Sequence, residues 1–131
     1  MDPGARNEKI LVRLREVMEY AYETSSFYKK KWDEAGIRAE HIRSLEDFEK
    51  VPVVTKNELR EAQARVEPFG DYLCIPTEGV HHVHGTSGTT GNPTVFAIGR
   101  EDWATVGENH ARVLWSMGLR PGDMIFIAAI F

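Results

Sequence analysis

One loop constrains the fold of this chain more than any other stretch. It runs from His84 to Thr94, and it combines three glycines with a cluster of small hydroxyl side chains. Short apolar stretches stand on both sides of it, with Val80 and Val83 before it and Val95–Ile98 after it. This order predicts a strand, a small polar loop and a second strand.

The composition of the loop suits an anion. Gly88 and Gly91 permit positive φ angles and a close approach of the backbone. Such a loop can turn several N–H groups inward, and its hydroxyl groups add further donors. Hydrogen bonds to a charged group contribute about 1.5–3 kcal/mol each, so a few of them can hold a phosphate without a basic side chain. A plain β-hairpin loop rich in turn residues is the alternative that composition alone leaves open.

Spacing excludes three common motifs. In a Walker A loop the fifth residue after the first glycine is again glycine, and lysine follows it. In this chain the fifth residue after Gly85 is Thr90. The dinucleotide pattern G-x-G-x-x-G fails because Ser87 occupies the position of its second glycine. The nucleophile elbow G-x-S-x-G fails because Thr89 replaces its last glycine.

The run Thr86–Thr94 resembles the phosphate loop of the adenylate-forming superfamily, which includes acyl-CoA synthetases, peptide-synthetase adenylation domains and luciferases. The usual pattern is [ST]-[SG]-G-[ST]-T-G-x-P, commonly with lysine at x, where this chain has Asn92. Within the superfamily the chain is most similar to phenylacetate–CoA ligases, from about Ser25 onward. The supporting segments are Phe27–Trp32, Ser44–Phe48, Pro52–Lys56 and Leu119–Asp123.

The resemblance implies an ATP-dependent ligase that joins an aryl carboxylic acid to coenzyme A. In the family an acid and ATP form an acyl-adenylate, with Mg²⁺ assisting, and CoA then displaces AMP. Motif position assigns cofactor binding to Thr86, Ser87, Gly88, Thr89, Thr90, Gly91 and Asn92. Because Asn92 removes the usual cationic contact, weaker ATP binding is expected. The catalytic residues, the acid pocket and the ribose contact are expected beyond Phe131.

Two other functions stay open. One is a relative that adenylates without using CoA, for instance a cofactor-adenylating enzyme that resembles coenzyme F390 synthetase. The other is a non-catalytic interaction domain that keeps the fold, a reading favoured here only by Asn92. Nothing in the sequence distinguishes phenylacetate from benzoate or another aryl acid.

Length, net charge and the distribution of apolar residues limit which other classes of partner the chain can have. The 131 residues suffice for one domain, and a net charge of −4 gives no footprint for nucleic acid or an anionic membrane. No apolar run approaches the about 18 residues of a transmembrane helix, and the start of the chain shows no secretory signal. The single Cys74 cannot form an internal disulfide, which suits a cytoplasmic location.

The first part of the chain, residues 1–79, reads as mainly helical. Apolar spacing predicts an amphipathic helix from Glu8 to Thr24, and a second short helix from Phe27 that Gly36 ends. Two further helices are predicted from helix-start signals, one beginning at Ser44 with Asp47 three residues on, and one beginning at the capping box Thr55–Glu58.

The second part, residues 80–131, predicts strand, loop, strand, helix and strand. The helix Arg100–Met117 carries an apolar stripe that should dock on a sheet, and Met124–Phe131 reads as a strand buried on both faces. Together they predict a βαβ unit, and so an α/β fold. The chain as a whole is expected to be an incomplete N-terminal piece of the large adenylation domain, and its open strand predicts a homo-oligomer.

Three histidines on the first strand raise the question of a metal. His82 and His84 share one strand face, and His-x-His occurs at zinc sites. The pattern offers no further ligand set, since His41 and His110 fall in helical segments elsewhere. We therefore predict no metal site, and interpret His81, His82 and His84 as strand residues beside the loop.

Overall fold

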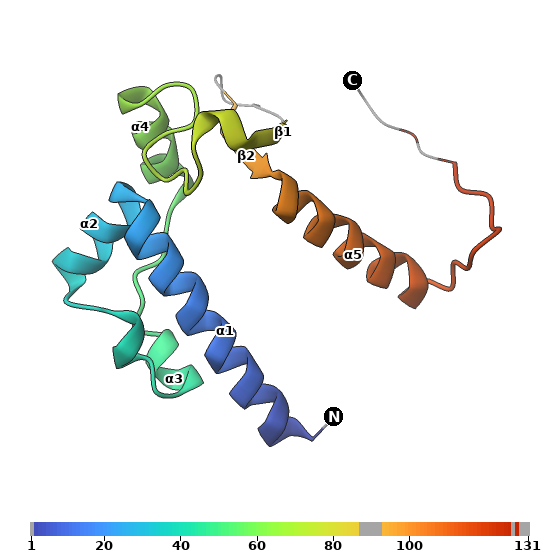
Figure 1. Ribbon diagram of the computed structural model, residues 1–131, viewed down its shortest axis with the longest axis horizontal. Coiled ribbons are helices and arrows are strands. Elements are labelled where there is room, and N and C mark those ends of the chain that lie inside the picture. The colour runs from blue at the N-terminus through green and yellow to red at the C-terminus, as the bar shows by residue number, and fades with distance from the viewer. Residues whose placement is uncertain (1, 87–92, 127, 129–131) are drawn as a thin grey trace.

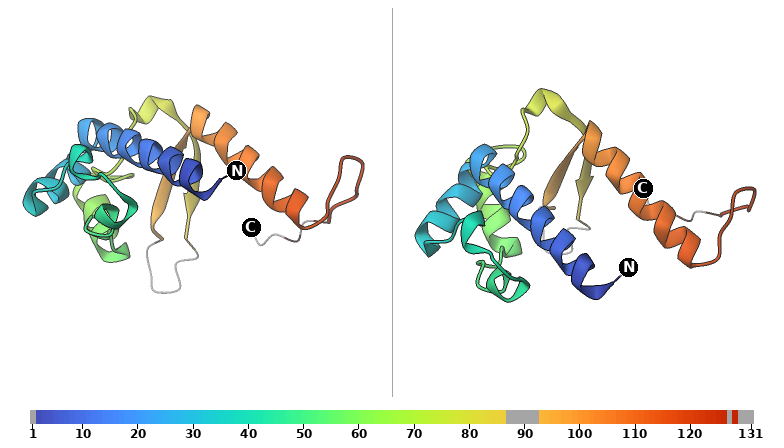
Figure 2. Two further views of the ribbon diagram at one scale, coloured as in Figure 1. Left: turned by 90° about the horizontal axis from the view of Figure 1, so that it is seen from below. Right: turned by 60° about the horizontal axis from the view of Figure 1, so that its bottom comes forward.

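The computed structural model describes residues 2–86, 93–126 and 128 of the chain. Four helices come first, a two-stranded hairpin follows, and a long helix comes last (Figure 1). The hairpin stands between the helices α1 to α4 and the helix α5, as Figure 2 also shows. The elements are α1 (Pro3–Thr24), α2 (Ser26–Ala35), η1 (Ala39–His41), α3 (Leu45–Phe48), α4 (Lys56–Arg65), η2 (Thr77–Gly79), β1 (Val80–Gly85), β2 (Val95–Gly99) and α5 (Arg100–Ser116).

Helix α1 begins earlier than the predicted start at Glu8. The Asp2 carboxylate accepts a hydrogen bond from the Ala5 N–H group at 3.0 Å, and Pro3 occupies the first helical position. A capping carboxylate followed by proline is a strong helix start, since proline brings a suitable φ and lacks the N–H that would go unpaired there. The helix therefore extends over polar residues that the apolar spacing did not include.

The break between α1 and α2 falls at Ser25, as predicted. Ser25 is buried, and its hydroxyl accepts from the Tyr28 N–H group and donates to the Asp71 carbonyl. Helix α2 ends at Gly36, which has a φ of 65°. The glycine thus supplies the left-handed conformation that commonly ends a helix, which confirms the predicted boundary.

The buried core lies among the first helices. Met18 and Ala21 of α1 pack with Trp32 of α2 and with Ala39 and Ile42 around η1. Burying a large apolar side chain contributes about 1.5–3 kcal/mol as an upper bound, so this cluster is the main stabilising element of the described part.

The next two α-helices begin where predicted, and both starts are capping boxes, although a box was predicted only for Thr55–Glu58. The Ser44 hydroxyl accepts from the Asp47 N–H group and the Asp47 carboxylate accepts from the Ser44 N–H group. Thr55 and Glu58 exchange the same pair of bonds at the start of α4. Lys50 and the N–H groups of Arg43 and Ser44 hold the pKa of the Asp47 carboxyl at about 2.

Strands β1 and β2 form an antiparallel hairpin, which confirms the predicted strand, loop and strand. Val83 pairs with Ala97 and Gly85 with Val95, with an irregularity between Val80 and His82. The hairpin therefore brings the two ends of the candidate loop side by side.

Helix α5 confirms the prediction for Arg100–Met117 almost to the residue, and Gly118 follows it with a φ of 96°. Its apolar stripe, however, does not dock on a sheet along its length. Only the N-terminal end packs against the hairpin, while Val113 and Met117 are 56% and 73% exposed. A two-stranded sheet offers a face only about 10 Å wide, so it covers the first turns of the helix and no more.

The predicted buried strand Met124–Phe131 is not formed at residues 124–126. Met124 and Phe126 are 97% and 92% exposed, and residues 124–126 and 128 belong to no strand. A strand needs a hydrogen-bonded neighbour, and the described residues place none beside this segment. The other residues of that prediction lie outside the described residues.

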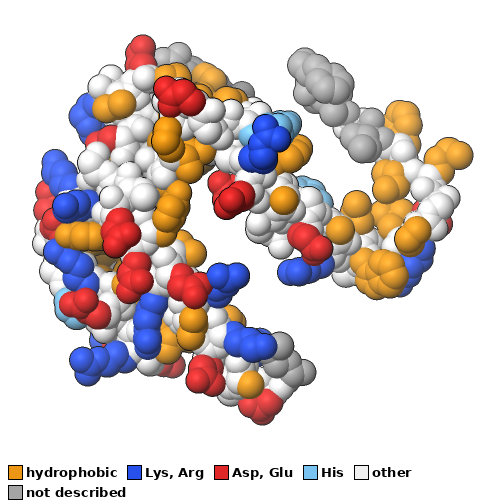
Figure 3. Space-filling model, in the orientation of Figure 1, with side chains coloured by type: hydrophobic (Ala, Val, Ile, Leu, Met, Phe, Trp, Pro, Cys, Tyr) orange, Lys and Arg blue, Asp and Glu red, His pale blue; other side chains and the backbone are white. Residues whose placement is uncertain are grey.

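Hydrophobic side chains gather at the C-terminal end of α5 and on the segment that follows it (Figure 3). None of the described helices is long and apolar enough to cross a bilayer. The α/β class with short N-terminal helices is confirmed as a mixture of helices and a two-stranded sheet. That residues 1–131 form part of one large adenylation domain stays a prediction.

Candidate functional site

Two threonines close the base of the candidate phosphate loop. The Thr86 N–H group donates to the Thr94 carbonyl at 3.0 Å, and the Thr94 N–H group donates to Thr86 Oγ1 at 3.0 Å. Thr94 is fully buried and Thr86 is half-buried. The Thr86 hydroxyl accepts one bond and still carries a proton that it can donate.

Thr86 is the one predicted site residue that the structure describes. It lies immediately after β1, where the sequence placed the start of the loop. The other predicted phosphate-binding residues lie outside the described residues, and their assignment stays a prediction; they are Ser87, Gly88, Thr89, Thr90, Gly91 and Asn92.

Side chains from the helical part hold the strand that leaves the loop. The Val95 N–H group donates to Gln63 Oε1 at 3.1 Å, and the Tyr72 hydroxyl donates to the Val95 carbonyl at 2.7 Å. Burial raises the pKa of the Tyr72 phenol, which therefore stays a hydrogen-bond donor. Sequence reasoning missed both side chains, because no local pattern links a helical glutamine or a tyrosine to a distant strand.

The histidines of β1 pack against α5. The His82 and Trp103 rings stack with their centroids 3.7 Å apart and their planes 9° apart, and His81 and His84 lie farther from the indole. Among residues 2–86, 93–126 and 128, no group of three or more His, Cys, Asp or Glu side chains is placed to hold a metal ion. The observed role of His82 is to fix the start of α5 on the hairpin.

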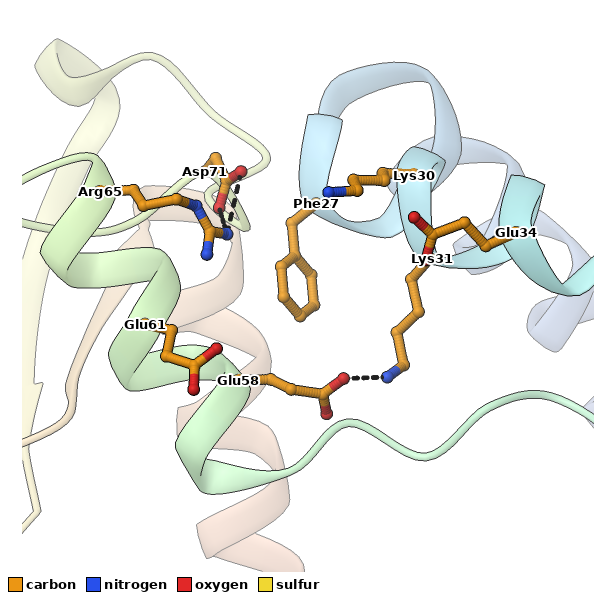
Figure 4. A pocket seen from close by; sticks show the side chains of 8 residues that line it. All are labelled: Phe27, Lys30, Lys31, Glu34, Glu58, Glu61, Arg65 and Asp71. Carbon is orange, nitrogen blue, oxygen red and sulfur yellow. Dashed lines mark hydrogen bonds and ion pairs between the residues drawn. The ribbon is translucent and has the colours of Figure 1, made fainter.

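A charged pocket of about 200 Å³ lies between α2 and α4 (Figure 4). Lys31 forms an ion pair with Glu58, and Arg65 lies 3.3 Å from the Asp71 carboxylate. The Lys31 ammonium, together with the Thr55 N–H and hydroxyl groups, lowers the pKa of the Glu58 carboxyl to about 2. Because these cations already face carboxylates, the pocket is a poor anion site, and the Thr86–Thr94 loop is the better candidate.

No family model matches the chain. Curated relatives do match it over most of its length. The phenylacetate–CoA ligase of Thermus thermophilus is 40% identical over 113 residues, which are 86% of this chain and 24% of the relative. The Escherichia coli phenylacetate–CoA ligase is 38% identical over 119 residues, or 88% of this chain and 25% of the relative. The chain is therefore similar to phenylacetate–CoA ligases over most of its own length.

Solved ligases of the adenylate-forming superfamily share the fold. A 2-hydroxyisobutyryl-CoA ligase in complex with 2-HIB-AMP and CoA superimposes with a TM-score of 0.93 at 54% identity. The match covers 100% of this chain and 28% of that ligase. The same ligase in its postadenylation state gives a TM-score of 0.93 at 52% identity. The chain thus matches the N-terminal part of such enzymes, and it spans about a quarter of their length.

Proposed function

We propose that the protein carrying this chain is an ATP-dependent acid–CoA ligase, and that the Thr86–Asn92 loop holds the phosphates of ATP. The observation that carries the proposal is the closed base of the loop. Thr86 and Thr94 fix its two ends at the end of the β1–β2 hairpin, in a chain similar over its whole length to a ligase solved with an acyl-adenylate and CoA.

In the proposed reaction, a carboxylate oxygen attacks the α-phosphorus of ATP and pyrophosphate leaves. The sulfur of CoA then attacks the acyl carbon, and AMP leaves. The first step develops negative charge on the departing pyrophosphate, which N–H and hydroxyl donors can stabilise if they are already in place. Thr86 would supply one such hydroxyl.

Mg²⁺ would be held chiefly by the phosphates of ATP. The loop Thr86–Asn92 contains no carboxylate, which is the protein ligand that this ion prefers. Asn92 stands where a lysine would add a point charge, so the loop relies on neutral donors and on the bound ion.

Two classes of carboxylic acid are candidates for the substrate. The 34–40% identity to curated phenylacetate–CoA ligases favours an aryl acid. The higher identity of 54% to a 2-hydroxyisobutyryl-CoA ligase favours a small 2-hydroxy acid as the second candidate. The acid pocket is expected outside residues 1–131, so both acids belong in the test.

The test measures two half-reactions of the complete protein that carries this chain. Labelled pyrophosphate should exchange into ATP only with a suitable acid, and CoA should then cause release of AMP. Phenylacetate, benzoate and 2-hydroxyisobutyrate form the panel. Exchange without any effect of CoA would mean an adenylating enzyme with another acceptor. Absence of both ATP binding and exchange would favour a non-catalytic interaction domain and overturn the proposal.

A further inference from the structure

Val95 is bonded on its outer side by side chains instead of by another strand. The outer edge of a strand carries N–H and C=O groups that normally pair with a neighbouring strand or with water. Here the N–H group donates to Gln63 and the carbonyl accepts from Tyr72, at 3.1 Å and 2.7 Å. Val95 follows Thr94 directly, so the pair acts at the point where the chain leaves the loop.

The two side chains are themselves held in place. Gln63 Nε2 donates to the Pro68 carbonyl at 3.0 Å, which fixes the amide with its oxygen toward Val95. The Tyr72 ring packs closely on Gly70, where an added Cβ atom would lie 2.6 Å from a ring carbon. With little freedom left in either side chain, the pair can hold the backbone of Val95 in one position.

We propose that Gln63 and Tyr72 are positioning residues for the phosphate loop. They fix Val95, Val95 fixes Thr94, and Thr94 holds Thr86 through two hydrogen bonds. This inference rests on the proposed function, and it specifies which half-reaction depends on the pair. The loop is proposed to bind the β- and γ-phosphates of ATP, which leave as pyrophosphate. Adenylation should therefore depend on the pair, while thioester formation from the finished acyl-adenylate should not.

The experiment uses the complete protein with four single variants. Tyr72→Phe removes the hydroxyl, and Gln63→Met removes the acceptor while keeping the length of the side chain. Gln63→Glu keeps an acceptor for the Val95 N–H group but loses the donor to the Pro68 carbonyl, so it serves as a partial rescue. Tyr20→Phe is the matched control, because the Tyr20 hydroxyl also donates to a backbone carbonyl, that of Cys74 at 2.8 Å, and not to a residue at the base of the loop.

Tyr72→Phe should raise KM for ATP in pyrophosphate exchange roughly fivefold, the loss expected for one hydrogen bond. Gln63→Met should raise it at least as much, because it also loses the bond to the Pro68 carbonyl. Thioester formation from added acyl-adenylate should keep the wild-type rate. Gln63→Glu should return KM for ATP part of the way from the Gln63→Met value, and Tyr20→Phe should leave both half-reactions unchanged. An equal loss in both half-reactions, or an unchanged KM for ATP, would overturn the positioning role.

Amide hydrogen exchange of the same variants separates this inference from the proposed function. The Val95 and Thr94 amides should exchange faster in Gln63→Met than in the wild type, whatever reaction the protein catalyses. If the wild-type protein shows no acid-dependent exchange of pyrophosphate, the proposed function fails while the amide data still report on the bonds to Val95. Unchanged protection of Val95 in Gln63→Met would overturn the inference by itself.

Discussion

Thr94 combines complete burial with an unused hydroxyl group. Its side-chain oxygen has no hydrogen-bond partner among the described residues, and the residue is 0% exposed. A buried polar group without a partner costs about 1–3 kcal/mol. Thr94→Val should therefore leave the free energy of unfolding unchanged or raise it by up to about 1 kcal/mol.

Thr86→Val is the matched variant, and it should act in the opposite direction. It removes the oxygen that accepts from the Thr94 N–H group, so the free energy of unfolding should fall by about 1 kcal/mol. Urea unfolding of both variants at one pH measures the two changes in the free energy of unfolding. A clear loss of stability in Thr94→Val would mean that its hydroxyl does form a bond that stabilises the fold.

The Glu58 carboxyl gives the chain a defined response to acid. Its pKa lies at about 2 in the folded state against an ordinary value of 4.5, chiefly because of Lys31. The ionised form thus stabilises the fold above pH 4.5, and this contribution disappears as the pH falls toward 2. The Tm of the wild type should fall through that window, and the Tm of Glu58→Gln should fall less steeply. Glu61→Gln, one turn along the same helix, is the control and should follow the wild type.

Single residues were predicted well where their effect is local. Ser44, Thr55 and Gly36 set helix boundaries through bonds to neighbours three or four positions away or through their own φ angle, and all three boundaries were predicted. Gln63 and Tyr72 were not predicted, because their partner Val95 lies 32 and 23 residues away in the sequence.

At the scale of the element, two glycines should respond to alanine with opposite signs. Gly36 has a φ of 65° and open space around it, so Gly36→Ala strains the backbone and should lower the free energy of unfolding by about 1 kcal/mol. Gly107 lies inside α5, also in open space, so Gly107→Ala should raise it by up to about 1 kcal/mol. Chemical unfolding monitored by circular dichroism measures both changes in the free energy of unfolding. If the two substitutions changed it in the same direction, the assignment of Gly36 as a left-handed cap would be contradicted.

The self-association expected of the segment after α5 stays a prediction. Met124 and Phe126 are almost fully exposed, and Trp115 near the end of α5 is exposed as well. Apolar side chains grouped in this way favour contact between copies. Sedimentation velocity over a range of concentrations should show a larger species that Phe126→Lys weakens. Val53→Lys is the control, since Val53 is also exposed but belongs to another part of the surface; a monomer at every concentration would refute the prediction.

The periodicity of α5 predicted the helix but not its environment. Apolar spacing reports which side of a helix avoids water, and the Arg100–Met117 stripe shows that side clearly. Which partner covers it depends on how much sheet lies nearby, and the described sheet has only β1 and β2. The same limit explains why Met124–Phe126 read as a strand, since β-propensity cannot supply a hydrogen-bonded neighbour.

At the scale of the whole molecule, the 131-residue chain by itself should be inactive. The proposed site residues all lie in one loop, while adenylation requires several groups to be held around the same phosphates. The chain also spans only about a quarter of the ligases it matches. Acid-dependent pyrophosphate exchange by the purified chain should stay at background, with a phenylacetate–CoA ligase as the positive control. Exchange well above background would contradict this expectation.

The hydrogen bonds between Thr86 and Thr94 separate what the hairpin needs in order to fold from what its loop needs in order to bind a ligand. They use main-chain groups and a single side-chain oxygen, so they place no demand on the identity of residues 87–92. Mutations between the two threonines can therefore alter affinity for a ligand at little cost to folding. Under the proposed function, Asn92 in place of the common lysine would be such a change, and selection could explore others in the same interval while the strands keep their register.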